Sequence, residues 1–327
     1  NTADIVEQWS ARIRGQIEPF LDFDGPAAAR MANNYDWLGS LGAIELMRDV
    51  GKHFPVPFML AKESVSSRLA SGISYTEFSY MILQSYDFLE LYRRQQCQLQ
   101  VGGSDQWGNI TAGTELIRRA DSGRAFGLTC PLVTNADGTK FGKTEKGTIW
   151  LSAKRTSPYE FYQFWMGSDD RSVVSYLKTF TFLSHGEILD LEKSVAENPG
   201  QREAQRTLAA LVTELVHGKD AAQKAERISR ALFYGELTQL LEDEIEEAFH
   251  DVPTHAMEGA ESPLINLLMD ASVASSKRQA RQDITSGAIY LNGERCTDLD
   301  HTVRKADGLH GRYIVIRRGK NKYTLVQ

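Results

Sequence analysis

Two lysines three residues apart, Lys140 and Lys143, lie in the glycine-rich segment NADGTKFGKTEKGTIW. Glycines flank and separate the two lysines and give this part of the backbone freedom to move. Cations on such a segment suit a site where negative charge builds on a transferring phosphate group and then leaves. Taken alone, the segment is more typical of a solvated β-turn. The phosphate-binding interpretation therefore depends on other motifs.

The sequence QVGGSDQWGN has the residue types of a nucleotide-binding turn. Gly102 and Gly103 let the backbone approach a ligand closely. Asp105 can accept hydrogen bonds from ribose hydroxyls, and Gln106 can offer its amide group to a carboxylate or a phosphate. Asn109 then opens a predicted helix, whose N-terminus attracts anions. A double glycine alone would carry little weight, but this combination predicts a nucleotide site.

A third set of polar side chains lies in EFSYMILQSYDFLEL. On a helix, Tyr80, Gln84 and Asp87 stand at i, i+4 and i+7 and project from one face. A point on the helix axis midway between Tyr80 and Gln84 lies roughly 7–8 Å from the level of Asp87. This distance is similar to the length of an amino acid with a long, polar-tipped side chain. On spacing alone, a mixed polar helix face without a ligand is the more common arrangement.

The elements that position these side chains follow from local patterns. CQLQVGG reads as a strand that runs into a tight turn, NITAGTELIRRA as a helix, and FGLTCPLV as the next strand. Strand, turn and helix form the βα unit of a parallel sheet, and ligands bind at the carboxyl ends of such strands. Residues 157–250 are helical in pattern, and we interpret the acids at 242–247 as a solvated helix face. The tail reads as a small α+β module.

Composition excludes several classes of protein. No run of residues approaches the ~18 apolar residues of a membrane span, and the three cysteines are far apart without a CxxC pair, which argues against a zinc site or a disulfide framework. The net charge is −6 overall, but residues 262–327 carry 11 Lys+Arg against 6 Asp+Glu. A basic tail on an acidic body predicts that the tail meets a polyanion.

In combination the motifs are far more specific than any one of them. GGSDQWGN followed by KFGKT resembles the tyrosyl-tRNA synthetases, where KFGKT is the tyrosyl form of the class I K-M-S-K-S loop. It departs from that general pattern at Phe141, Gly142 and Thr144, as is usual in the family. YTEFSYMILQSYDF, TSPYEFYQFW and SKRQARQDITSGAIYLNGER extend the resemblance over essentially the whole chain, and the last is similar to the S-four-type RNA-binding module that ends bacterial members.

The resemblance implies an α/β fold in three domains. Residues 1–152 would be a Rossmann-like parallel-sheet catalytic domain without its N-terminal part, 153–255 a helical domain for the tRNA anticodon arm, and 256–327 the S-four-type domain. It also implies tyrosine, ATP and tRNA(Tyr) as partners, with Mg²⁺ carried mainly on the phosphate oxygens and no tightly bound metal. We further expect a cytoplasmic homodimer, with Tyr75 near the subunit contact, and no membrane partner.

The resemblance also assigns roles to the polar side chains noted above. Tyr80 and Gln84 would hold the substrate ammonium, Asp87 would bond the phenolic hydroxyl, and Gln106 would contact the carboxylate end. The ATP ribose would lie against Gly103 and Asp105, with Gln100 beside them, and Lys143 would also contact ATP. The residues that would stabilise the pyrophosphate in the transition state are Lys140, Lys143 and Thr144.

Two further groups complete the expected set. Asn34 and Trp37 would support the residues that contact the substrates, although simple packing is an equal alternative for Trp37. The basic side chains expected to grip tRNA are Lys277, Arg278 and Arg281 on one helix face and Arg317 and Arg318 in the final hairpin. Such contacts are mostly to phosphates and weaken steeply with salt.

One departure from the family pattern concerns histidine. None of the seven histidines forms the His-x-Gly-His signature of class I synthetases, so we expect roughly 90 residues that carry it to precede this sequence. Two other functions remain open at this point: an RNA-binding or splicing factor that reuses the fold without catalysis, and an enzyme that activates tryptophan. The lysine pair and the polar face of 80–87 argue against the first, and Asp87 facing a phenol favours tyrosine over tryptophan.

Overall fold

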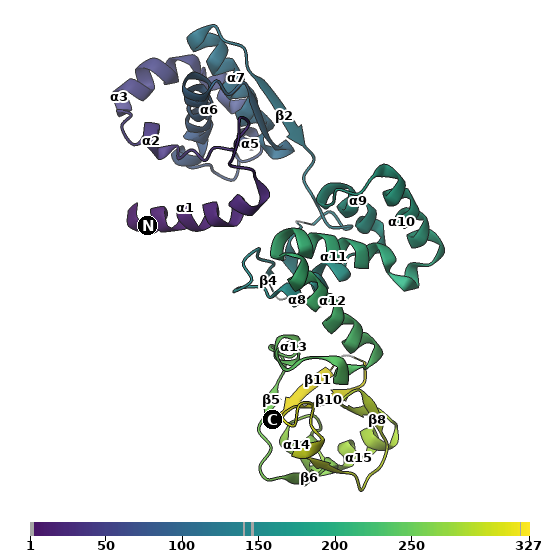
Figure 1. The fold of residues 1–327 in the computed structure, drawn as a ribbon. Coiled ribbons are helices and arrows are strands. Elements are labelled where there is room, and N and C mark those ends of the chain that lie inside the picture. The colour runs from purple at the N-terminus through teal and green to yellow at the C-terminus, as the bar shows by residue number, and fades with distance from the viewer. Residues whose placement is uncertain (1–2, 140, 145–146, 321) are drawn as a thin grey trace. The chain divides into compact units, whose positions relative to one another are not determined.

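The structure is a computed structural model that describes residues 3–139, 141–144, 147–320 and 322–327. The chain divides into two compact units, Asn1–Phe141 and Gly142–Gln327. The purple-to-teal part of the ribbon in Figure 1 is the first unit, and the remaining teal, green and yellow parts are the second. Each unit is described by itself.

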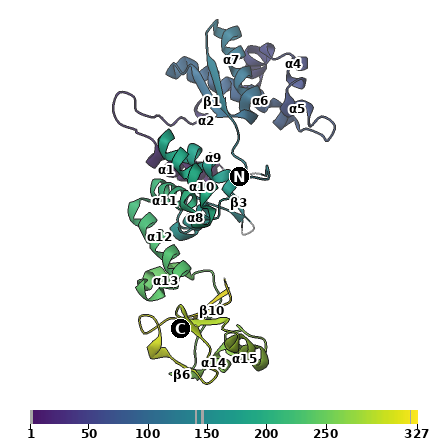
Figure 2. The same ribbon diagram turned by 90° about the vertical axis from the view of Figure 1, so that its right-hand side faces the viewer.

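The first unit is a helical layer around a short parallel sheet (Figures 1 and 2). Its longest helix, α6, packs on α7, which connects strands β1 and β2. The full element order is α1 Ala3–Ile17, η1 Glu18–Phe20, α2 Tyr35–Leu38, α3 Ala43–Glu45, η2 Leu46–Val50, η3 Gly51–His53, α4 Val56–Leu60, α5 Glu63–Ser66, α6 Tyr75–Gln95, β1 Leu99–Gly103, η4 Ser104–Gln106, α7 Trp107–Asp121 and β2 Phe126–Cys130.

Local signals explain where α6 begins and how it packs. Ser74 caps the helix, and its capping box with Glu77 satisfies two backbone donors at the N-terminus. On the buried side, Phe88 is 1% exposed and lies over Gly113 of α7. A Cβ at Gly113 would lie 3.0 Å from Phe88 Cδ1, so glycine at this position lets the two helices approach closely. This contact buries one side of α6 against α7.

The predicted βα unit is confirmed. β1 and β2 pair in parallel, with Leu99 opposite Phe126 and Gly103 opposite Cys130. Gly103 therefore ends β1 at the carboxyl edge of the pair, and η4 and α7 follow it directly. The helix begins at Trp107, two residues before the expected Asn109, because the 3-10 turn at 104–106 already starts the helical path.

Helices fill the first half of the second unit, as the sequence predicts for residues 157–250. Their core is aromatic: Trp165 contacts Phe161, Tyr176 and Phe180 edge to face, with ring centroids 5.1–6.3 Å apart. The elements are β3 Lys143–Thr144, β4 Gly147–Thr148, α8 Pro158–Met166, α9 Asp170–Phe180, α10 His185–Glu197, η5 Pro199–Gln201, α11 Glu203–His217, α12 Lys219–Tyr234, η6 Leu237–Gln239 and α13 Glu242–Ala248.

A small α+β region ends the second unit, as expected for the tail. Its sheet has the strand order β5-β11-β10-β7-β8, in which β5 and β11 are parallel and the other pairs antiparallel. The elements are β5 Thr254–His255, β6 Glu261–Pro263, α14 Leu264–Asp270, α15 Lys277–Thr285, β7 Ile289–Leu291, β8 Glu294–Cys296, β9 Thr302–Arg304, η7 Lys305–Asp307, β10 Ile314–Arg318 and β11 Lys322–Val326. Together, the parallel sheet with its connecting helix and this mixed module confirm the α/β fold class.

The interpretation of the acidic stretch 242–247 as a solvated helix face holds for Glu242, Asp243 and Glu246, which are exposed, but is wrong for Glu244. Glu244 has a side chain that is 2% exposed, and its Oε1 pairs with Arg227 Nη2 at 2.7 Å. The other oxygen accepts a hydrogen bond from the backbone N–H of Leu241 at 3.0 Å. A buried carboxylate needs such partners, and the cation comes from another helix, α12, which local sequence does not reveal.

None of the helices in the described part of the chain combines the length and the apolar character that a membrane span requires.

Candidate active site

The carboxylate of Asp87 is held from two sides by residues near α2. Trp37 Nε1 donates a hydrogen bond to Asp87 Oδ1 at 2.7 Å, and Asn34 Nδ2 donates to Asp87 Oδ2 at 3.1 Å. Each carboxylate oxygen keeps a further lone pair. The carboxylate is therefore fixed in orientation and can still accept a hydrogen bond from a ligand.

Trp37 has a polar role here in addition to packing. Its side chain is 6% exposed, and the guanidinium of Arg94 lies 5.6 Å from the ring. An indole N–H can only donate, so in this bond Asp87 Oδ1 is the acceptor. Asn34 and Trp37 thus both contact Asp87, which is one of the residues predicted to bind tyrosine.

Gln84 is tied to the beginning of α7. Its Oε1 accepts a hydrogen bond from Asn109 Nδ2 at 2.9 Å, and the carbonyl oxygen retains a second lone pair. Tyr80, one turn earlier on α6, is 58% exposed. No local pattern marks the pairing of Gln84 with Asn109, because the two residues lie on separate helices and only the βα topology brings them together.

The turn after β1 is as tight as its glycines suggest. A Cβ at Gly103 would lie 2.6 Å from Asp105 Oδ1 and 2.8 Å from Leu132 Cδ2, so a larger residue here would require both side chains to shift. Gln106 Nε2 donates to Asp105 Oδ2 at 3.0 Å, which orders the two side chains against each other. The Oε1 atom of Gln100 is buried without a hydrogen-bond partner in the described residues. Buried acceptors are normally satisfied, so Gln100 is suited to a donor supplied by a ligand.

Only one of the two lysines, Lys143, belongs to the residues that the structure describes. Lys140 is outside the described residues, whereas Lys143 and Thr144 form β3, which pairs with β4 in a hairpin. Gly138 and Gly142 have φ values of +81° and +82°, a region that side chains other than glycine rarely adopt. The turn chemistry expected for this segment is thus present. The hairpin belongs to the second unit, and the polar face of α6 belongs to the first.

The basic residues of the tail divide into two kinds. Lys277, Arg278 and Arg281 are exposed on α15 and have no ion pair within the described part of the chain. Arg318, in contrast, pairs with Asp283 Oδ2 at 2.9 Å and donates to the carbonyl oxygen of Val273. The α15 residues are thus the more available contacts for a polyanion.

Arg317 lies on the other side of the same strand. Its guanidinium lies 3.9 Å from the ring centroid of Tyr290, directly across the strand pair. Cation–π contact of this kind fixes the direction of the guanidinium without neutralising its charge. Arg317 therefore remains suited to a phosphate contact.

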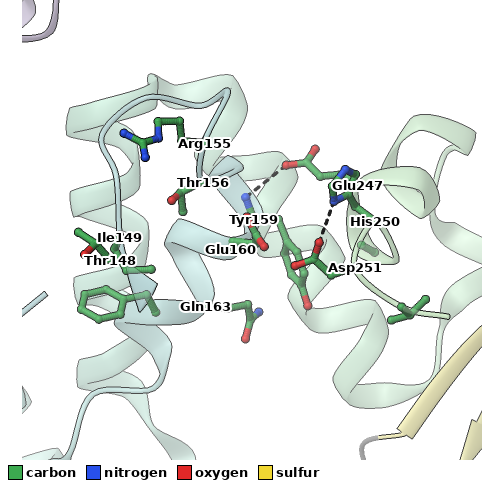
Figure 3. Close-up of a pocket in the computed structure, with 13 residues that line it drawn as sticks. Thr148, Ile149, Arg155, Thr156, Tyr159, Glu160, Gln163, Glu247, His250 and Asp251 are labelled. Carbon is green, nitrogen blue, oxygen red and sulfur yellow. Dashed lines mark hydrogen bonds and ion pairs between the residues drawn. The ribbon is translucent and has the colours of Figure 1, made fainter. Parts of the chain in front are cut away.

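A separate cavity of about 800 Å³ lies in the second unit, between β4, α8 and the end of α13 (Figure 3). Tyr159 and Gln163 line it from α8. On the facing side, Glu247 accepts a hydrogen bond from the backbone N–H of Tyr159 at 3.2 Å, and His250 contacts Asp251 at 3.0 Å. Among the residues whose side chains the structure describes, none of those predicted to bind tyrosine or ATP lines this cavity. The described residues also contain no group of three or more His, Cys, Asp or Glu placed to hold a metal ion.

Comparison with known proteins matches two consecutive parts of the chain to two families of protein domains. The profile described as tRNA synthetases class I (W and Y) matches residues 1–234, and that of the tyrosine–tRNA ligase SYY-like C-terminal domain matches residues 244–326. The tyrosine–tRNA ligase of Geobacillus stearothermophilus is 58% identical over 329 aligned residues, which cover 100% of this chain and 78% of that protein. Tyrosine–tRNA ligase 1 of Bacillus anthracis is 56% identical, with 100% and 79% covered. Among solved structures, a C-terminally truncated Aspergillus nidulans mitochondrial tyrosyl-tRNA synthetase is 31% identical, with a TM-score of 0.55 over 70% of this chain and 65% of that one.

Proposed function

Because the chain belongs to the class I tRNA synthetases and, among them, to the tyrosine–tRNA ligases, we propose specific roles for its residues in making tyrosyl-tRNA. The enzyme joins tyrosine to ATP as tyrosyl-adenylate and then transfers the tyrosyl group to tRNA(Tyr). In such a reaction the tyrosine carboxylate attacks the α-phosphate, and pyrophosphate leaves. The protein's contribution is to position the reactants and to stabilise charge.

Tyrosine lies along the polar face of α6 in this proposal. Asp87 accepts a hydrogen bond from the phenolic hydroxyl, while Tyr80 and Gln84 accept from the ammonium group one to two turns away. Gln106 approaches the carboxylate end. The arrangement selects tyrosine over phenylalanine because phenylalanine would leave a half-buried carboxylate without its third partner, and an unpaired buried acceptor costs about 1–3 kcal/mol or more.

ATP lies at the carboxyl end of β1. The tight approach at Gly103 lets a ribose contact the backbone, and Asp105 accepts hydrogen bonds from its hydroxyls. The free acceptor of Gln100 supports a ribose or base donor nearby. Mg²⁺ enters with ATP on the phosphate oxygens and needs no set of protein ligands of its own.

The glycine-hinged hairpin acts on the phosphates. Lys140, Lys143 and Thr144 stabilise the negative charge that develops on the leaving pyrophosphate. Cations aimed at charge that appears only in the transition state raise the rate of the chemical step more than the affinity for ATP.

The observation that carries this proposal is the Asp87 carboxylate fixed by Trp37 and Asn34. It is tested by tyrosine-dependent exchange of labelled pyrophosphate into ATP, using the protein expressed from its full reading frame. Asp87→Ala should lose most of this activity, while Asp4→Ala, which removes an exposed carboxylate from α1, should retain it. Full activity of Asp87→Ala would remove Asp87 from the tyrosine site.

tRNA binds the basic tail in this proposal. Lys277, Arg278 and Arg281 contact phosphates from one face of α15, and Arg317 and Arg318 from β10. Neutralising one phosphate contact should reduce the slope of log Kd against log salt by about 0.7–0.9. Lys277→Gln is the variant to measure, and an affinity for tRNA(Tyr) that does not respond to salt would contradict the assignment.

We also propose that the enzyme works in the cytoplasm as a homodimer. The side chain of Tyr75, at the beginning of α6, is 74% exposed, which suits a residue covered by a second subunit. Light scattering should give the mass of a dimer for the wild type and a shift towards monomer for Tyr75→Asp.

A further inference from the structure

A glutamine side chain can present either of two groups to a ligand. The amide of Gln84, proposed above to hold the substrate ammonium, carries an oxygen that accepts and an NH2 group that donates. An ammonium group has only donors, so it needs the oxygen. Rotation about the last side-chain bond interchanges the two ends, and this torsion has two broad minima. Another residue must therefore select the end of the amide that faces the ammonium group.

Asn109 makes this selection through one hydrogen bond. Its Nδ2 donates to Gln84 Oε1 at 2.9 Å, and both side chains are partly buried. An amide NH2 group cannot accept, so a rotated Gln84 would bring two donors together without an acceptor between them. The oxygen that accepts from Asn109 keeps its second lone pair. The bond therefore holds Oε1 in place and leaves it able to accept from the ammonium group as well.

Helix packing keeps the donor and the acceptor together. Phe88 lies one turn after Gln84 on α6, and Gly113 lies one turn after Asn109 on α7. The side chain of Phe88 is 1% exposed and lies so close to Gly113 that a Cβ there would be 3.0 Å from Cδ1 of the ring. The hydrogen bond and this apolar contact are therefore neighbours in one interface. Since closely packed interiors resist displacement, the two amides remain within reach of each other.

Contacts with the sheet fix the beginning of α7 in the same way. Ile110, the residue after Asn109, is 1% exposed. Its Cδ1 lies 3.3 Å from the position of a Cβ at Gly102 of β1, and its Cγ2 lies 2.5 Å from that of a Cβ at Gly127 of β2. Glycine on both strands thus lets this isoleucine pack directly on the sheet. The backbone that carries Asn109 is therefore held by the strands as well as by α6.

We propose that Asn109 is a positioning residue that turns the amide oxygen of Gln84 towards the ammonium group of tyrosine. It acts through Gln84 and does not touch the substrate. The proposal rests on the proposed tyrosine site and adds a determinant of its selectivity, because a ligand with a cationic nitrogen at this point is favoured over one that lacks it. The phenolic end of the substrate is independent of Asn109, since Asp87 is oriented by Trp37 and Asn34.

Asn109→Leu tests this role in the protein expressed from its full reading frame, because it removes both polar atoms and keeps a branched, neutral side chain. In pyrophosphate exchange the KM for tyrosine should rise about fivefold, the effect of one hydrogen bond of about 1 kcal/mol, while the KM for ATP stays unchanged. The Ki of tyramine, which keeps the ammonium group and lacks the carboxylate, should rise by the same factor. The Ki of 3-(4-hydroxyphenyl)propionate, which lacks the ammonium group, should not change. General damage to the pocket would raise both Ki values.

Matched variants complete the experiment. Thr114→Val changes another polar residue of α7, whose hydroxyl donates to the carbonyl oxygen of Thr111, and it should have wild-type constants. Asn109→Ala covers the case in which Asn109→Leu does not fold, and it should show the same difference between the two inhibitors. In a Gln84→Ala background, Asn109→Leu should have no further effect, because both substitutions act on one contact.

The outcomes separate this role from the proposed tyrosine site. Wild-type constants in a folded Asn109 variant overturn the positioning role, and so do equal changes in the two Ki values. Additive effects of the Asn109 and Gln84 substitutions overturn it as well, since they would mean that the two residues act independently. A wild-type KM for tyrosine in Gln84→Ala would instead refute the proposed ammonium contact.

Discussion

The most informative single substitution is Trp37→Phe. It removes the indole N–H that donates to Asp87 Oδ1 at 2.7 Å and keeps an aromatic ring at a site that is 6% exposed. A hydrogen bond to a charged group contributes about 1.5–3 kcal/mol. Because Asp87 is only half-buried, water can replace part of the lost hydrogen bond. The lower end of the range, about 1.5 kcal/mol, therefore applies. Since about 1.4 kcal/mol corresponds to a factor of ten, kcat/KM for tyrosine should fall about tenfold.

Pyrophosphate exchange, measured over a range of tyrosine concentrations and then over a range of ATP concentrations, gives separate kinetic constants for the two substrates. The loss should be confined to tyrosine, because Asp87 meets only the phenolic end of the substrate, and the KM for ATP should not change. Trp9→Phe is the matched control: Trp9 is 46% exposed on α1, and its substitution should have no effect. Wild-type tyrosine kinetics in Trp37→Phe, or an equal change in the KM for ATP, would refute the reasoning.

Three stability predictions follow from packing and charge. Gly113→Ala places a Cβ 3.0 Å from Phe88 Cδ1 and should destabilise the fold by about 1–3 kcal/mol in urea titration; an unchanged midpoint would show that the helices separate freely. Two arginines lower the pKa of Glu115 from 4.5 to about 2, so its stabilisation is present above pH 4.5 and is lost towards pH 2; the stability difference between wild type and Glu115→Gln should shrink over that range, and a constant difference would contradict the pairing. Arg227→Met removes the cation from the buried carboxylate of Glu244, which keeps its bond from the Leu241 N–H, and should cost about 1–3 kcal/mol, measured by thermal unfolding; a loss under about 1 kcal/mol would mean that water replaces the arginine.

Features set by neighbouring residues could be predicted from the sequence. The i, i+4, i+7 spacing predicted the polar face of α6, and the Ser74 cap at its beginning is likewise a local feature, because capping and helical periodicity depend only on local residues. Likewise, Gly103 marked the end of β1, since its apolar run and glycine turn lie next to each other in the chain. The family resemblance then supplied roles that spacing alone did not distinguish from an ordinary polar helix face.

Features that depend on contacts between distant segments could not be predicted. The pairing of Asn109 with Gln84 and that of Glu244 with Arg227 join separate helices, and no local pattern marks them. Leu241 lies between the buried Leu240 and Ile245 in the sequence but is 58% exposed, because a break between η6 and α13 turns it outward.

The central claim is that one face of α6 binds tyrosine along its length, and a structure with a non-hydrolysable tyrosyl-adenylate analogue tests it most directly. The account predicts the phenolic oxygen within hydrogen-bond distance of the Asp87 carboxylate and the ammonium group between Tyr80 and Gln84. An analogue bound with its phenol away from Asp87 would contradict the account.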